Sequence, residues 1–166
     1  MKTRDYLRSH EALLQPEGRH TRVRLNGMEA VIRNMPELEI RQMLNKAVAL
    51  MLERLRRNLE RSRLRFEENS LEQIGLRVAL HNLYLHMMWD EFWPRYRRGV
   101  RRLEPDELLR CQVGEQVLLF CQRHYGDDYK TRAMALLGYT PREFMCWEAQ
   151  RLELRMRTDS PLYRVA

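Results

Sequence analysis

The stretch TRAMALLGYTPREFMCWEAQ, residues 131–150, is the best-defined local pattern in the chain and guides the prediction of the fold. Apolar residues recur at helical spacing on both sides of Gly138, and glycine commonly ends a helix. Residues 140–143, TPRE, combine a capping box with a proline at the first helical position. The sequence therefore predicts a helix over 129–137, a turn at Gly138 and a final helix over about 141–157.

The composition extends this helical prediction to the whole chain. Only 6 prolines and 7 glycines occur in 166 residues, and leucine, methionine, arginine and glutamate are frequent. We expect an all-α fold, a compact bundle of about six or seven helices. A long helix over 36–67 and an apolar helix over 71–93 would form its antiparallel core pair. The chain is predicted to be a single helical domain, 1–166, with an arginine-rich body over 1–103 and a C-terminal subdomain over 104–166.

The N-terminal region is predicted to contribute two short helices and one extended segment. Residues 3–15 fit an amphipathic helix, and residues 28–34 fit another. Between them, HTRVRLNG at 20–27 alternates apolar and basic residues, which fits either an isolated strand or an extended basic segment. Because a lone strand is only marginally stable, the extended segment is the favoured interpretation.

The charge of the chain indicates a polyanionic partner. Its 30 basic and 23 acidic residues give a formal net charge of +7, and almost all of the basic residues are arginines. Arginine suits bidentate contacts to phosphate and guanine, although a bias towards G+C-rich codons would also favour it. Residues 54–66 hold one arginine cluster, which fits either a surface that contacts a phosphate backbone or a solvated helix surface. The densest cluster comprises Arg95, Arg97, Arg98, Arg101 and Arg102, which also fits a basic linker.

Other sequence features argue against several classes of protein. The three cysteines are odd in number and irregularly spaced, so they form no disulfide framework. The N-terminus lacks a secretory signal, and no apolar run reaches the roughly 20 residues needed to span a bilayer. A cytoplasmic protein without a membrane segment is expected. His81 and His86 are not at metal-ligand spacing, and Cys121 and His124 lack a second pair. We therefore expect no metal, no cofactor and no enzymatic activity.

The segment 130–149 resembles the DNA-binding helix-turn-helix motif. Gly138 occupies the turn position, and Phe144 and Trp147 occupy positions that dock the second helix. Met134 departs from the pattern, which prefers a small residue there. The resemblance covers about one eighth of the chain, and no family covering the whole chain is recognised. A structural corner between two capped helices is the alternative interpretation of the same residues.

The resemblance implies a set of DNA-binding residues. The second helix would present Arg142, Met145, Cys146, Ala149 and Gln150 to the major groove, with Arg142 reading guanine and Gln150 reading adenine. Lys130 and Thr140 would hold phosphates. Residues 104–166 hold ten acidic and nine basic residues, so the positive charge would come from upstream arginines, chiefly those between Arg95 and Arg102.

Two functions remain as hypotheses. The first is a transcriptional regulator that binds double-stranded DNA through the C-terminal motif, supported by arginine-rich surfaces, with a homodimer suited to paired half-sites. The second is a non-enzymatic helical adaptor or assembly protein that binds a protein partner or RNA through its basic surfaces.

Overall fold

The computed structural model describes residues 4–87 and 105–157, and it corrects the all-α prediction. The chain is mostly helical but also contains a three-stranded antiparallel sheet. In chain order the described elements are α1 (Tyr6–Ser9), β1 (Leu13–Glu17), β2 (His20–Leu25), β3 (Met28–Arg33), α2 (Glu37–Leu59), α3 (Glu68–Met87), α5 (Pro105–His124), the 3-10 turn Gly126–Asp128, α6 (Tyr129–Leu137) and α7 (Pro141–Arg157).

The sheet is a meander with strand order β1-β2-β3. It occupies the region predicted to form two short helices and an extended segment. The predicted helix over 3–15 is wrong beyond α1, because residues 13–17 pair with β2. The segment predicted as extended and basic is the central strand of the sheet. The predicted helix over 28–34 is also wrong, because it is β3. Asn26 and Gly27, with φ of 50° and 75°, form the tight turn that joins β2 to β3.

The meander is stable because one of its faces is apolar and buried. Thr21, Val23 and Leu25 alternate with basic residues on β2, and all three are buried. Their partners Ile32, Ala30 and Met28 on β3 are buried as well. The alternating pattern therefore belongs to a half-buried strand with a partner on each side.

The helix α2 is shorter than predicted. It ends at Leu59, and residues 60–67 connect it to α3 in non-helical conformation, so the predicted helix over 36–67 is wrong at its C-terminal end. Helix α3 begins at Glu68, three residues before the predicted start at residue 71. The predicted continuation of α3 to residue 93 lies outside the described residues. Helix α2 keeps one apolar stripe, whereas α3 is buried on several sides.

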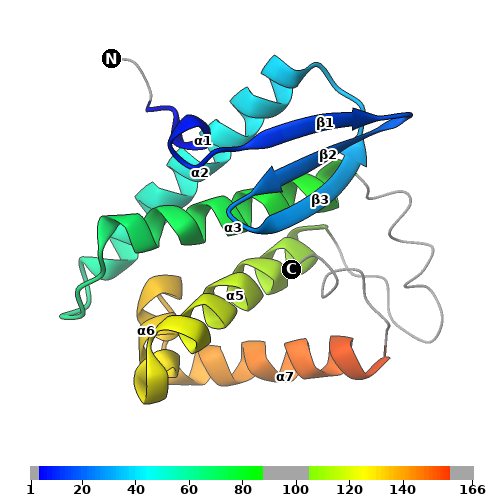
Figure 1. The fold of residues 1–166 in the computed structure, drawn as a ribbon. Helices are drawn as coiled ribbons and strands as arrows, with labels where there is room; N and C mark the ends of the chain where they lie inside the picture. Colours follow the sequence, from blue (N-terminus) through cyan, green and yellow to red (C-terminus); the bar gives the residue numbers. More distant parts are fainter. Residues whose placement is uncertain (1–3, 88–104, 158–166) are drawn as a thin grey trace.

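The helix α3 lies at the centre of the molecule. Figure 1 shows the sheet on one side of α3 and α5 on the other, with α2 packed along α3. Helix α7 lies on the far side of α5, and α6 lies at one end of α5, where it also contacts α2. The N-terminal residues are fastened to this core by polar contacts. Asn45 of α2 donates to the Arg4 carbonyl at 2.9 Å and accepts from the Tyr6 amide at 2.8 Å. Buried Glu72 of α3 pairs with Arg4 at 2.5 Å and His10 at 3.1 Å.

Candidate nucleic-acid interface

The helix-turn-helix candidate forms two helices with the predicted boundaries. Helix α6 ends at Gly138, which has a φ of 70° and is therefore in the left-handed region that glycine tolerates. The Thr140 hydroxyl oxygen accepts from the Glu143 amide at 3.2 Å, and the Glu143 carboxylate accepts from the Thr140 amide at 3.1 Å. This reciprocal pair confirms the predicted capping box. Hydrogen bonding from the backbone amide of Thr140, and secondly from its side chain, holds the pKa of the Glu143 carboxyl below its usual value.

Thr140→Ala removes half of this capping box. We expect the substitution to lower the free energy of unfolding by about 1 kcal/mol, because the Glu143 amide loses its acceptor. Chemical denaturation measures the loss, and Thr140→Ser is the control because its hydroxyl preserves the cap. Equal stability of the alanine and serine variants would contradict the assigned cap.

Helix α7 is docked on α5 by an aromatic ring and a buried ion pair. Phe144 and Trp147 are buried, as the motif predicts, and their ring centroids lie 5.4 Å apart. The indole of Trp147 lies directly over Gly114 of α5, where no side chain fits. One turn further along α7, Arg151 forms a two-point contact with the buried carboxylate of Glu115. These contacts fix which face of α7 points away from the core.

The exposed face of α7 carries all five residues predicted to face the major groove. Arg142, Met145, Cys146, Ala149 and Gln150 are all exposed. A pocket of about 380 Å³ lies along this part of α7. It is lined by Arg110 of α5, by Thr140, and by five residues of α7, which are Arg142, Glu143, Cys146, Trp147 and Gln150. The five α7 residues predicted to face the major groove therefore lie together on one accessible surface.

The cysteines differ sharply in accessibility. Cys111 and Cys121 are buried on α5, and burial raises the pKa of the Cys121 thiol to about 12. Cys146 is exposed on α7. Since the thiolate is the reactive form, Cys121 is chemically protected and Cys146 is accessible to a thiol reagent.

The residues predicted to hold phosphates differ in whether the structure describes them and in how they contact the protein. The Lys130 ammonium lies 3.7 Å from the Glu148 carboxylate, so it bridges α6 to α7 and is only partly free. Thr140 is engaged in the cap of α7, because its hydroxyl oxygen accepts from the Glu143 amide and its own amide donates to the Glu143 carboxylate. The predicted basic cluster Arg95, Arg97, Arg98, Arg101 and Arg102 lies outside the described residues.

Sequence reasoning missed several residues that surround the turn. Arg110 of α5 donates from Nε to the Tyr139 hydroxyl at 3.2 Å and lies 5.5 Å from the Tyr139 ring centroid. Asn58, at the end of α2, donates to the Leu136 carbonyl at 2.7 Å and lies against Gly138. Neither contact has a local sequence signal, because the partners are 29 and 78 residues apart. Gly114 lies in the middle of α5, where the missing side chain allows the ring of Trp147 to pack closely.

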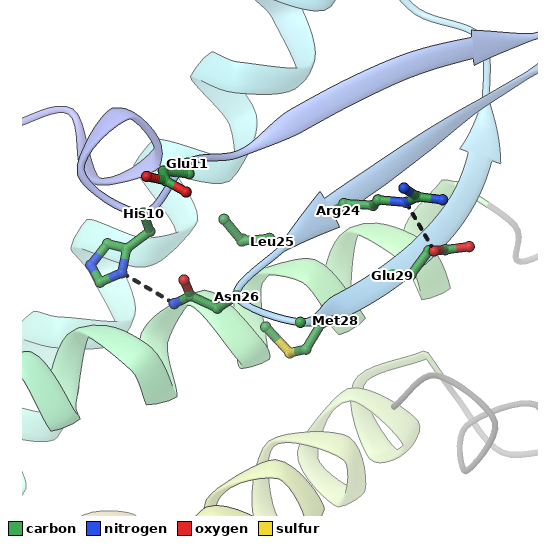
Figure 2. A pocket seen from close by; sticks show the side chains of 8 residues that line it. His10, Glu11, Arg24, Leu25, Asn26, Met28 and Glu29 are labelled. Carbon is green, nitrogen blue, oxygen red and sulfur yellow. Dashed lines mark hydrogen bonds and ion pairs between the residues drawn. The ribbon is translucent and has the colours of Figure 1, made fainter.

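A second pocket, of about 300 Å³, lies beside the turn between β2 and β3 (Figure 2). Both ring nitrogens of His10 have partners there, Asn26 at 3.1 Å and Glu72 at 3.1 Å. Arg24 pairs with Glu29 at 3.1 Å on the same wall. No cluster of three or more metal-ligand side chains occurs within residues 4–87 and 105–157. His10 thus connects the N-terminal segment to the hairpin and to α3, and Arg24 and Glu29 pair within the hairpin.

Comparison with known proteins adds no relative. No protein-family model, curated protein or solved structure matches the chain. Within the described part of the chain, none of the helices is both long and apolar enough to cross a membrane.

Proposed function

We propose that this protein is a DNA-binding regulator that reads double-stranded DNA with α7. The observation that supports this most directly is the orientation of α7. Trp147 and Arg151 hold one side of the helix against α5, whereas Arg142, Cys146 and Gln150 are exposed and line a pocket that borders this contact. A helix of this kind can enter a major groove with its N-terminal residues on base edges.

The three C-terminal helices form a unit suited to this role. Helix α5 supports α7 through Gly114 and Glu115, and it also packs against α6. Asn58 of α2, which lies outside this unit, supports the turn by donating to the Leu136 carbonyl and packing against Gly138. A rigid support matters because base readout by a bidentate side chain requires its helix to be held in one orientation.

Arg142→Ala tests the reading role. Arg142 is exposed, without a hydrogen bond or ion pair among the described residues, so its loss leaves the fold intact. We expect affinity for the preferred duplex to fall by roughly 1–3 kcal/mol, and binding to unrelated duplexes to change little. Selection from a random duplex pool, followed by anisotropy titration, measures both.

Arg123→Ala is the control for Arg142→Ala, because Arg123 is an exposed arginine at the far end of α5. Equal sequence enrichment by the wild type and both variants would rule out reading by Arg142.

One observation favours a second candidate function, a helical adaptor that binds a protein. Met145 and Leu152 are 69% and 54% exposed, and they lie seven residues apart with Ala149 between them, which places them on one face of α7. An exposed apolar stripe of this spacing is typical of a helix that binds another protein. In that case Met145→Asp would abolish partner binding and Arg142→Ala would have no effect.

A further inference from the structure

The segment that connects α2 to α3 presents arginines on one side. Residues 61–67 alternate between exposed and half-buried positions, with Ser62, Leu64 and Phe66 turned towards the protein. Arg61, Arg63 and Arg65 are consequently all exposed, and Arg54 on the last part of α2 is exposed as well. We call these four residues the arginine segment.

The positive charge of the arginine segment is not neutralised by ion pairs within the described residues. Within the described residues, Arg56 pairs with Glu68 and Arg57 pairs with Glu53, whereas the four guanidinium groups of the segment form no ion pair. The exposed carboxylates of Glu60 and Glu67 offset part of this charge. Four free guanidinium groups against two free carboxylates leave a net positive surface.

Contacts from Arg132 of α6 hold the segment beside the helix-turn-helix unit. The Arg132 guanidinium donates to the Arg65 carbonyl at 3.2 Å and to the Asp128 carboxylate at 2.9 Å. It also lies 5.1 Å and 4.5 Å from the ring centroids of Phe66 and Tyr125. Together with the contact of Asn58 at Gly138, these interactions attach the segment to both ends of α6.

We infer that the arginine segment is a contact surface for the sugar-phosphate backbone of duplex DNA, an assignment that rests on the proposed reading of DNA by α7. Side chains two residues apart in a non-helical chain are separated by at most about 7 Å, so several long arginines reach phosphates of one backbone. The segment supplies the positive charge that residues 104–166 lack. It exposes no large apolar side chain, which an interfacial membrane contact would need.

The test compares two double variants of the full chain that remove equal charge. Arg61→Gln/Arg63→Gln removes two members of the segment. Arg8→Gln/Arg19→Gln removes two other exposed arginines, Arg8 from α1 and Arg19 from the turn between β1 and β2. Figure 1 shows this turn and the connection between α2 and α3 at opposite ends of the molecule. Affinity for a short mixed-sequence duplex is measured by anisotropy over a range of salt concentrations.

The arginine segment predicts a specific change in salt dependence. The slope of log affinity against log salt concentration becomes shallower by about 1.8 in Arg61→Gln/Arg63→Gln, because each lost phosphate contact contributes about 0.9. The slope stays at the wild-type value in the control and in Arg61→Lys/Arg63→Lys, which keeps both charges. Thermal unfolding confirms that the exposed substitutions leave the fold intact.

The outcomes distinguish a failure of the proposed function from a failure of the role assigned to the arginine segment. A wild-type protein that binds no duplex overturns both the inference and the proposed function. A wild type that binds duplex DNA, with identical slopes in the two glutamine variants, overturns only the role of the arginine segment. Tighter binding to double-stranded RNA or to anionic vesicles than to duplex DNA, lost in Arg61→Gln/Arg63→Gln, assigns the surface to a different partner and also overturns the inference.

Discussion

Glu115→Ala is expected to lower the free energy of unfolding by about 3 kcal/mol or more, because it leaves the Arg151 guanidinium without its carboxylate in a mostly buried site. The Glu115 side chain is 2% exposed and that of Arg151 is 11% exposed. Arg151 also lies 5.8 Å from the Trp147 ring, so the ion pair and the aromatic contact support each other. Chemical denaturation of the full chain measures the loss.

Glu53→Ala is the matched control for this substitution. Glu53 and Arg57 form an ion pair of 2.9 Å on the surface of α2, with both side chains about two-thirds exposed. Such pairs contribute about 0.5 kcal/mol or less. If Glu115→Ala costs no more than Glu53→Ala, the ion pair does not hold α7. A double-mutant cycle with Arg151→Ala isolates the coupling between the two side chains.

Gly114→Ala is expected to destabilise the protein although alanine is the better helix former. In a helix exposed to solvent, the change would stabilise by about 1 kcal/mol. Here the new Cβ would lie 2.5 Å from Nε1 of Trp147 and overlap the adjacent ring carbons. Trp147 would have to leave its site, and α7 would move with it, so we expect a net loss of about 1–3 kcal/mol and impaired DNA binding.

Gly75→Ala in α3 tests the same substitution without the clash. Its Cβ would meet Val48 at 3.4 Å and Leu52 at 3.7 Å, which is close to ordinary van der Waals contact. We expect Gly75→Ala to be neutral or stabilising. Combining Gly114→Ala with Trp147→Phe should restore part of the lost stability, since the smaller ring frees space. A stabilising Gly114→Ala would contradict the packing of α7 on α5.

The parts of the fold that local chemistry determines were predictable. The final helix begins at Pro141 because the capping box and the proline act within four residues. The sheet differs from the prediction because the apolar spacing of both neighbours of β2 also fits a helix, and only the Asn26-Gly27 turn between β2 and β3 indicates a hairpin. The end of α2 was missed because residues 60–67 contain no proline or glycine.

The residues of the candidate site divide in the same way. The exposed set on α7 followed from its helical period, because burial of Phe144 and Trp147 determines the opposite face. The supports of that helix did not follow, because Glu115 and Arg151 are 36 residues apart and Arg132 and Arg65 are 67 apart. Contacts between distant segments depend on tertiary packing and leave no local pattern.

Protection of Cys146 from a thiol reagent tests the placement of α7 on DNA most directly. In the free protein, alkylation should occur at Cys146, since Cys111 and Cys121 are buried. Mass spectrometry measures the rate at each cysteine with and without saturating duplex DNA, and anisotropy confirms that the duplex is bound. We predict that bound duplex strongly slows alkylation of Cys146. A bound duplex that leaves this rate unchanged would contradict the entry of α7 into the groove.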